Sequence, residues 1–250
     1  MARLAQTAGL TDVQQEILST VKTFVDKEII PHATALEHAD TYPQDIVDGM
    51  KEMGLFGLTI PEEFGGLGES LLTYALVVEQ IARGWMSVSG VINTHFIVAY
   101  MLTQHGTDEQ KQRLLPQMAL GEVRGGAFSM SEPDLGGSDV AAIKTKAVRD
   151  GDDYVIDGAK MWLTNGGTSN LIALLVKTDE GKPKAHQNLT AFLVEKPTGY
   201  GEVAPRPDHP PARSTRWATR ASTPRRRCST ATASRRRRSW AARPVRASRR

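Results

Sequence analysis

The first part of the chain, to about residue 120, carries the hydrophobic periodicity of helices. From Val13 to Val25, apolar side chains recur three or four positions apart, which is the spacing of one helix face. Thr11 and Gln14 have the spacing of a capping box, in which two side chains satisfy amides at a helix start. Pro31 is expected to bend or end this helix because it lacks an amide hydrogen. The pattern predicts further helices over residues 44–53, 70–82 and 87–104, and a last one between a second capping box, Thr107–Gln110, and Pro116.

Residues 57–68 interrupt this helical pattern. Four of these twelve residues are glycine, which is too many for a helix. Glycine tolerates unusual backbone angles and lets another chain segment come close. We therefore expect the backbone to turn sharply here or to approach another segment closely.

Beyond the helices, the hydrophobic pattern becomes that of short strands. Residues 144–149 and 154–157 alternate in polarity and flank Asp150–Asp153, a hairpin-like turn. Residues 171–176 and 189–194 are apolar runs of strand length. Short strands at this spacing indicate a small antiparallel barrel or sandwich.

The last 45 residues, 206–250, differ from the rest of the chain in charge. They hold 15 Arg, no Lys and one acidic residue, Asp208. Since the whole chain has 31 Lys and Arg and 28 Asp and Glu, residues 1–205 carry 16 basic and 27 acidic groups. A segment with so few aliphatic residues cannot bury enough surface to offset its chain entropy, so we expect it to be disordered.

These patterns together predict an α+β protein in three parts. An all-helical N-terminal domain would occupy residues 1–120, and a small antiparallel β-barrel or sandwich domain would occupy residues 121–205. The Arg-rich disordered tail would occupy residues 206–250.

Composition excludes several classes of site and location. The only cysteine, Cys228, lies in the tail, which excludes disulfides and thiolate metal sites elsewhere. The six histidines show no metal-binding spacing. The apolar stretch Leu71–Val78 is cut by Glu79, well short of the ~20 residues that cross a membrane. The N-terminus shows no signal or transit peptide, so we expect a cytoplasmic protein without a membrane segment.

Two segments of the strand region carry groups suited to a planar heterocyclic ligand. Residues 128–139 form a predicted strand that ends in a loop rich in glycine and hydroxyl groups, although an ordinary polar surface loop has the same composition. In residues 160–167, Trp162 and Thr164 are two positions apart, which would place them on one face of a strand. A core tryptophan before an ordinary Asn-Gly turn is the alternative.

Three segments, in this order, resemble the acyl-CoA dehydrogenase family over residues 11–205. Thr59–Gly66 looks like the family's loop of proline, two glutamates, an aromatic residue and two glycines. Ser131-Glu132-Pro133 with Gly137-Ser138-Asp139, and then Trp162–Gly166, look like its two flavin-contact segments, the first with one residue more than is common. The resemblance implies a helical domain followed by a β domain.

The resemblance also implies FAD as the cofactor. Ser131 would hydrogen-bond the polar edge of the flavin ring, Trp162 would pack beside it, and Thr164 would place a hydroxyl near its reactive nitrogen. Ser138 would be shared between the flavin and the CoA arm of the substrate. The implied contact residues are Phe128, Ser129, Met130, Ser131, Gly137, Ser138, Trp162, Leu163 and Thr164.

The reaction implied by the resemblance is α,β-dehydrogenation of an acyl-CoA thioester, with hydride transfer to FAD. The glutamate that removes the α-proton would come from a C-terminal helical bundle beyond the match, so no catalytic residue is assigned. Nothing supports that role for Glu132, Glu195 or Glu202. An electron-transfer flavoprotein as acceptor and a homotetramer are also implied, and we expect the 250-residue chain to be inactive or unstable.

The Arg-rich tail has a second interpretation, as a shifted reading frame. With permitted codons, Pro211–Pro224 read two nucleotides later gives Gly-Lys-Ile-Asp-Lys-Met-Gly-Tyr-Lys-Gly-Val-Asp-Thr, which resembles the family's continuation. Arg206–Pro210 read one nucleotide later gives Gly-Leu-Thr-Ile-Pro. We therefore hypothesise one extra base near Pro205 and another in the codons of Pro210 and Pro211.

Two other functions remain open from the sequence. An acyl-CoA oxidase or a flavin monooxygenase would use the same scaffold and differ in its electron acceptor. A non-catalytic protein could instead bind nucleic acid through its basic tail, because Arg clusters attract phosphate. The acidic body and the scarcity of aromatic residues in the tail argue against the nucleic-acid function.

Overall fold

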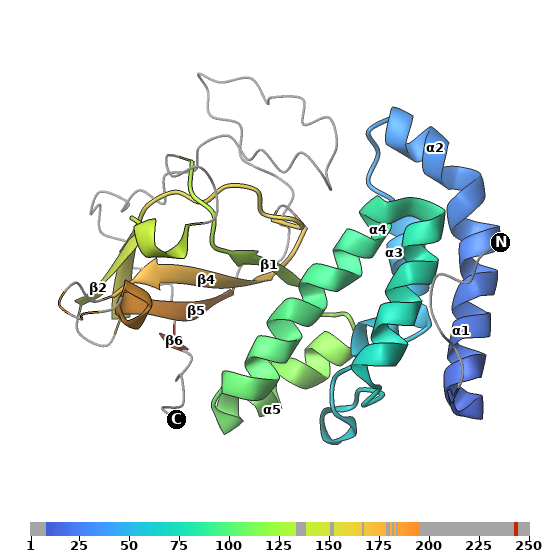
Figure 1. Ribbon diagram of the computed structural model, residues 1–250, viewed down its shortest axis with the longest axis horizontal. Coiled ribbons are helices and arrows are strands. Elements are labelled where there is room, and N and C mark those ends of the chain that lie inside the picture. The colour runs from blue at the N-terminus through green and yellow to red at the C-terminus, as the bar shows by residue number, and fades with distance from the viewer. Residues whose placement is uncertain are drawn as a thin grey trace.

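Helices form the first half of the described chain and strands form the rest (Figure 1). The computed structural model describes residues 9–133, 139–150, 153–166, 168–178, 181, 183, 185–195 and 243–244. The helices are α1 (Asp12–Phe24), α2 (Ile30–His38), α3 (Gln44–Glu52), α4 (Leu71–His105) and α5 (Asp108–Ala119). The strands are β1 (Gly125–Ser129), β2 (Lys146–Asp150), β3 (Asp153–Asp157), β4 (Leu171–Lys177), β5 (Leu189–Glu195) and β6 (Arg243–Pro244).

Helix α1 starts at the predicted capping box and runs into α2 without a break. Thr11 and Gln14 each accept a hydrogen bond from the other's backbone amide, as predicted. Between the two helices, Val25–Ile29 form a π-helical turn, and Pro31 lies in the first turn of α2. Pro31 therefore does not end the helix, and the missing amide hydrogen of the proline coincides with the change from π-helical to α-helical bonding.

The structure contains both helices that were predicted over 70–82 and 87–104, and they are joined at a kink and labelled together as α4 (Leu71–His105). Its backbone stays helical from Leu71 to His105 except at Trp85, where φ is −161° and ψ is 109°. By length and composition alone α4 could cross a membrane, but a core helix has the same properties. Since 56% of its most apolar window is buried inside the molecule, α4 serves here as the core helix.

The glycine-rich segment 57–68 folds back closely on itself. The Leu67 amide donates to the Gly57 carbonyl at 2.9 Å. A Cβ atom on Gly66 would lie 2.0 Å from the Ile60 carbonyl oxygen, so only glycine fits at that position. The close backbone approach predicted from the four glycines is confirmed.

The sheet is mixed, whereas an antiparallel barrel or sandwich was predicted. Its order is β3-β2-β4-β5-β6, and the β2–β3 and β4–β5 pairs are antiparallel. β1 pairs with the first half of β4 in parallel, and Lys146 of β2 bridges the end of β4 on that same edge. Within the described residues the sheet does not close into a barrel. The long connection between β1 and β4 makes their parallel pairing possible, and no local pattern reports it.

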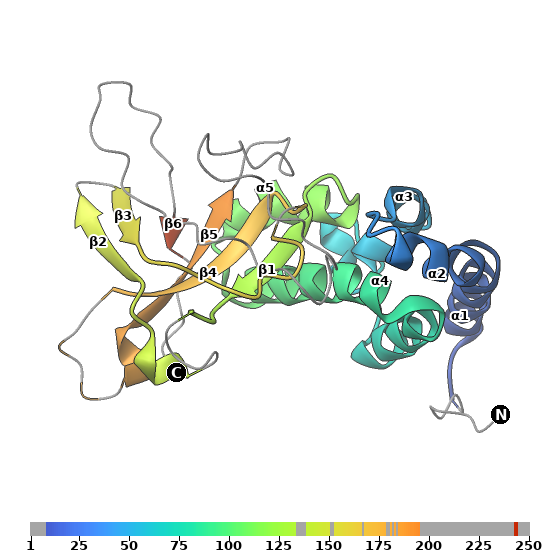
Figure 2. The same ribbon diagram turned by 90° about the horizontal axis from the view of Figure 1, so that it is seen from above.

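The sheet and the helices share one apolar core at the junction of α4 with β1 (Figure 2). The core cluster that includes Leu102 of α4 extends to Leu171 and Ala173 of β4 and to Leu193 of β5. A second, smaller cluster lies farther out in the sheet, and its buried members are Ala147, Val176 and Phe192.

His95 joins the two parts at this junction. It is fully buried, and its Nδ1 accepts a hydrogen bond from the Gly125 amide at 3.1 Å. The ring proton is therefore on Nε2, which donates to the Phe56 carbonyl at 3.0 Å. Burial lowers the pKa of His95 to about 4, the bond to Phe56 opposes this shift, and the charge of Arg124 adds to it. The imidazole is thus held neutral in one tautomer.

Of residues 206–250, the structure describes only Arg243 and Pro244, which pair with Leu193 and Phe192 of β5. The disorder expected for this tail stays a prediction.

Candidate functional site

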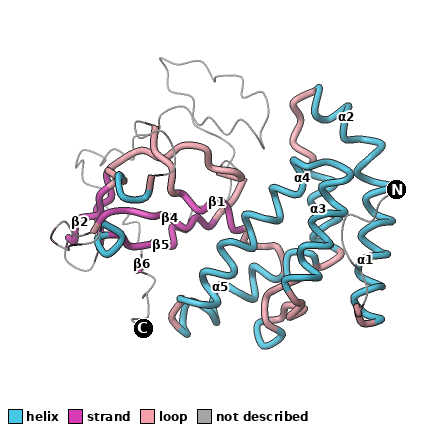
Figure 3. The backbone as a smooth tube through the Cα atoms, in the orientation of Figure 1, coloured by secondary structure: helices cyan, strands magenta, loops and turns pink. Residues whose placement is uncertain are grey.

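The two segments that the sequence singled out lie against each other at the end of β1. The Met161 amide donates to the Ser131 carbonyl at 2.9 Å. The Lys160 ammonium donates to the Met130 carbonyl, also at 2.9 Å. Figure 3 shows the loops that follow β1 and β3 on the same side of the sheet. Residues thirty positions apart in sequence are therefore brought into direct contact.

A buried ion pair lies beneath this junction. Lys160 Nζ is 2.9 Å from Glu132 Oε1, and the two side chains are only 7% and 5% exposed. Glu132 also accepts hydrogen bonds from the amides of Lys144 (2.8 Å) and Thr145 (2.9 Å) and from the Thr145 hydroxyl (2.5 Å). The carboxylate therefore receives four donors, as a buried charge requires.

The environment shifts the pKa of both partners. Burial favours the neutral form of Glu132, but the hydrogen bonds from Thr145, the Lys144 amide and Lys160 outweigh it, so its pKa lies below the usual value. Burial lowers the pKa of Lys160, and the Glu132 carboxylate offsets only part of this. Glu132 is thus held as a carboxylate, with its oxygens directed at internal donors.

Trp162 stands out in the second segment. Its side chain is 56% exposed, and its φ of 62° is in the left-handed region. A bulky residue there is strained, and such strain persists only where the surroundings fix it. Residues 160–164 form no strand, so the prediction that Trp162 and Thr164 share a strand face is wrong. The ring is instead presented by an irregular backbone.

The turn that follows, Thr164–Gly166, is anchored on helix α4. Asn165 is buried, and its Nδ2 donates to the Val91 carbonyl at 3.0 Å and to the Thr94 hydroxyl at 2.5 Å. A Cβ atom on Gly90 would lie 3.7 Å from the methyl group of Thr164. The absence of a side chain at Gly90 therefore leaves space beside Thr164.

Arg124 fixes the far side of the same turn. Its guanidinium donates to the Thr168 carbonyl and to the Tyr42 hydroxyl, each at 2.8 Å. Its amide donates to Asn170 Oδ1 at 2.7 Å. The turn is therefore held between the helical part and the start of β4.

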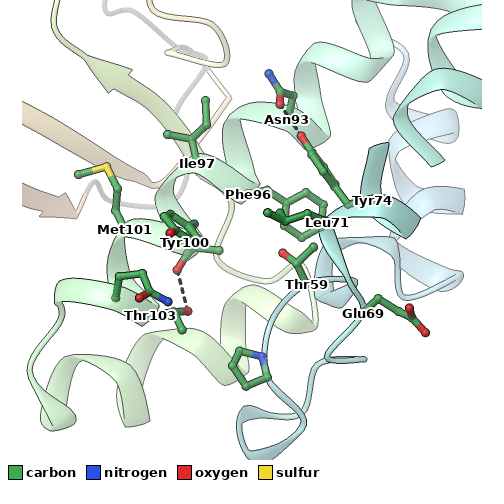
Figure 4. Close-up of a pocket in the computed structure, with 13 residues that line it drawn as sticks. Thr59, Glu69, Leu71, Tyr74, Asn93, Phe96, Ile97, Tyr100, Met101 and Thr103 are labelled. Carbon is green, nitrogen blue, oxygen red and sulfur yellow. Dashed lines mark hydrogen bonds between the residues drawn. The ribbon is translucent and has the colours of Figure 1, made fainter. Parts of the chain in front are cut away.

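A cavity of about 450 Å³ runs along α4 (Figure 4). Its lining includes Asn93, which lies three residues along α4 from Gly90, the residue that Thr164 approaches. The hydroxyl of Tyr74 is hydrogen-bonded to Asn93 Oδ1, and Figure 4 shows the two side chains together at one end of the lining. Most of its wall is apolar, and its other residues include Thr59, Leu71, Phe96, Ile97 and Tyr100.

Comparison with known proteins places the chain in a family. The model of the acyl-CoA dehydrogenase N-terminal domain matches residues 11–122, and that of the acyl-CoA dehydrogenase middle domain matches residues 127–220. This chain belongs to the acyl-CoA dehydrogenase family. The resemblance seen in the sequence is therefore confirmed.

Individual members of the acyl-CoA dehydrogenase family agree with this assignment. The (2S)-methylsuccinyl-CoA dehydrogenase of Cereibacter sphaeroides is 37% identical over 193 residues, which are 77% of this chain and 35% of that protein. Butyryl-CoA dehydrogenase from Megasphaera elsdenii has a similar structure, with a TM-score of 0.71 and 30% identity over 78% of this chain and 51% of that one. The structure of a glutaryl-CoA dehydrogenase from Mycobacterium smegmatis in complex with FADH2 is also similar, with a TM-score of 0.66 and 28% identity. The match covers 74% of this chain and 46% of that one. The chain thus spans about a third to a half of the length of the curated relatives it matches.

The structure brings together most residues to which the acyl-CoA dehydrogenase resemblance assigns flavin contacts. Phe128, Met130, Ser131, Leu163 and Thr164 are half-buried around the junction, and Trp162 is exposed beside them. Ser129 is only 1% exposed, and its buried hydroxyl has no hydrogen-bond partner. Gly137 and Ser138 lie outside the described residues.

No role was predicted from the sequence for the residues that hold the site together. Glu132 and Lys160 were part of the quoted segments, and Asn165 was treated only as a turn residue. A partial signal existed for Lys160, which is the one charged residue of 160–167, whereas Glu132 shares its segment 128–139 with Asp134 and Asp139. Which charges pair depends on the fold, so their partnership was not predictable from spacing.

Proposed function

We propose that this chain binds FAD at the junction of residues 128–133 and 160–166 and that it is part of an enzyme dehydrogenating acyl-CoA thioesters. The observation that supports this most is the Met161–Ser131 backbone hydrogen bond, which brings Ser131 beside the segment that carries the exposed Trp162 and Thr164. A flat aromatic surface edged by hydroxyls suits a planar heterocycle with a polar rim.

When bound, FAD supplies the acceptor for the hydride that leaves the β-carbon of the acyl group. Trp162 would orient the ring by packing beside it, and the hydroxyls of Ser131 and Thr164 would donate to its polar edge. Donors at that edge favour the electron-rich reduced form. Ser138 is proposed to share its contacts between the cofactor and the CoA arm.

The α-proton must go to a base, and two carboxylates of the strand region are already engaged. Glu132 accepts four hydrogen bonds. Glu195 is bound through both oxygens to the Arg113 guanidinium, at 2.8 and 2.5 Å. We therefore propose that the base comes from outside the described residues, as the resemblance implies.

The cavity along α4 is proposed to take the acyl chain. Its wall is mostly apolar, as an alkyl chain requires, and its lining includes Asn93, three residues along α4 from Gly90, beside which Thr164 lies. In the complete enzyme, electron-transfer flavoprotein is the proposed acceptor of the electrons, and a homotetramer is the proposed assembly.

Titration of the 250-residue chain with FAD tests the proposal, followed by flavin absorbance and fluorescence. We expect saturable binding, and we expect Trp162→Ala to raise the Kd by about tenfold because ring stacking is worth roughly 1–3 kcal/mol. Val148→Ala, at an exposed position of β2, is the control and should leave the Kd unchanged. A folded chain that binds no FAD would contradict the proposal. Dehydrogenation of butyryl-CoA by this chain would show instead that one of its own carboxylates is the base.

A further inference from the structure

We propose that Glu132 and Lys160 are positioning residues for the flavin, whose buried ion pair sets the spacing between the segment after β1 and the segment that carries Trp162 and Thr164. This inference rests on the proposed function, because it assigns a role in FAD binding to residues that would not contact FAD themselves.

The contacts around Ser131 show how one side chain controls two segments. Lys160 Nζ donates to the Met130 carbonyl and to Glu132 Oε1, both at 2.9 Å, so it holds the residues on either side of Ser131. Ser131 itself is held from the same direction by the Met161 amide. Three consecutive residues of one segment are thus fixed by two consecutive residues of the other, and Trp162 follows directly.

Glu132 also connects these two segments to a third one, residues 144–145. Its two carboxylate oxygens accept the amides of Lys144 and Thr145, and the Thr145 hydroxyl as well. The chain between residues 133 and 143 therefore begins and ends at this one carboxylate. Ser138, which is proposed to contact FAD and the CoA arm, belongs to that chain segment.

A buried ion pair suits this task better than an apolar contact does. Hydrogen bonds to charged groups are short and directional, so they constrain the relative positions of the bonded groups, whereas the hydrophobic effect is non-directional. At 7% and 5% exposure, neither charge has enough water around it to replace a lost partner. Loss of one partner should therefore shift these segments rather than merely loosen them.

The strained backbone of Trp162 makes it sensitive to such a shift. A left-handed φ at a tryptophan is kept only while neighbouring contacts fix it. Lys160 and Met161 supply those contacts immediately before it. When they are released, Trp162 should relax to an ordinary φ and turn its ring away from the flavin.

The test measures FAD binding and flavin fluorescence in three variants of the 250-residue chain. Lys160→Met is the test variant, and Lys160→Arg and Arg113→Met are its controls. Lys160→Met removes the ammonium but leaves Glu132 its three other donors, so the chain should still fold. We expect an increase in the Kd for FAD of about tenfold or more, because displacements of about 1 Å have effects of this size. We also expect brighter fluorescence from the flavin that remains bound, because Trp162 would no longer quench it. Lys160→Gln is the second variant should Lys160→Met not fold.

The two other variants separate positioning from general stability. Lys160→Arg keeps the positive charge and should restore most of the affinity and the quenching. Arg113→Met removes an ion pair between α5 and the end of β5, away from the two segments, and should change neither quantity. A variant that merely unfolds a fraction of the molecules lowers the amount of bound flavin without changing its brightness.

Amide hydrogen exchange gives a readout that does not need the flavin. The Met161 amide should exchange at least about tenfold faster in Lys160→Met than in the wild-type chain, and at the wild-type rate in Arg113→Met. If the wild-type chain binds no FAD, the proposed function fails. The exchange rates then still test whether the Glu132–Lys160 pair holds the two segments together. Equal Met161 exchange rates in Lys160→Met and wild type overturn this inference, as does unchanged FAD affinity and brightness in Lys160→Met.

Discussion

The helical part of the molecule and the candidate site are stabilised by different interactions. The helical part has a continuous apolar core, in which Val25, Ile29 and Ile92 are completely buried. The candidate site is held mainly by directional polar contacts, above all those of Glu132 and Lys160. Apolar burial is strong but tolerates small displacements, whereas hydrogen bonds define positions. The difference indicates that the helices supply stability and the polar contacts supply the geometry of the site.

The largest expected effect is on the free energy of unfolding, when one buried phenylalanine of each core is replaced by alanine. Phe56 is 1% exposed in the main core and lies edge-on to His95, with ring centroids 5.0 Å apart. Phe192 is fully buried in the smaller cluster, against Tyr154. We expect Phe56→Ala to lower the free energy of unfolding by about 5 kcal/mol and Phe192→Ala by about 3 kcal/mol, because the smaller cluster can collapse more easily around the void. Urea unfolding followed by circular dichroism measures both, and a larger loss for Phe192→Ala would contradict the comparison.

The next effect concerns His95, the buried polar group at the junction of the two parts. Because its pKa is lowered to about 4 in the folded state, the unfolded chain takes up this proton at a higher pH than the folded chain does. Stability should therefore fall as the pH drops from about 6.5 to about 4, and this contribution should then level off. The loss should be on the order of 3 kcal/mol. Denaturant unfolding across this pH range measures it, and His95→Gln, which cannot take up this proton, should show a flatter profile. Identical profiles would be evidence against this role.

The smallest expected effect concerns the anchor of the site on α4. Asn165 combines a left-handed backbone, with φ of 59°, and two hydrogen bonds from its amide group. We expect Asn165→Ala to cost about 2 kcal/mol, since it loses these bonds and places a Cβ in a strained conformation. Asn165→Gly loses the same bonds without that strain and should be less destabilising by roughly 0.5–1 kcal/mol. Thermal unfolding ranks the two variants, and the reverse order would exclude a contribution from the backbone.

Features set by neighbouring residues could be predicted from the sequence. The two capping boxes, the β2–β3 hairpin and the close approach at Gly66 are all found as predicted. Each depends on side chains or backbone within about ten residues, so a local pattern is sufficient to report it. The two candidate segments were also found by local pattern, and their order in the chain led to the correct family.

Features set by distant residues could not be predicted in this way. The parallel pairing of β1 with β4 joins residues more than forty positions apart, and alternation of polarity carries no information about strand direction. The left-handed φ of Trp162 arises from the contacts that hold Lys160 and Met161, and a local pattern would make this stretch an ordinary strand. The Glu132–Lys160 pair is likewise visible only once the fold has brought the two segments together.

The π-helical turn between α1 and α2 determines which side of α1 faces the rest of the molecule. A π turn holds one residue more than an α turn, which corresponds to about 100° of rotation. Val25 and Ile29, its first and last residues, are both fully buried and flank the spot where a Cβ on Gly84 would meet them, at 2.7 and 3.0 Å. Deleting one residue of the turn would restore a regular α-helix, yet it would swing the whole of α1 about its axis and take Asp26 away from Arg83, its partner at 2.6 Å. The extra residue of the π turn thus rotates α1 relative to α2, so that buried residues of the continuous helix face α4.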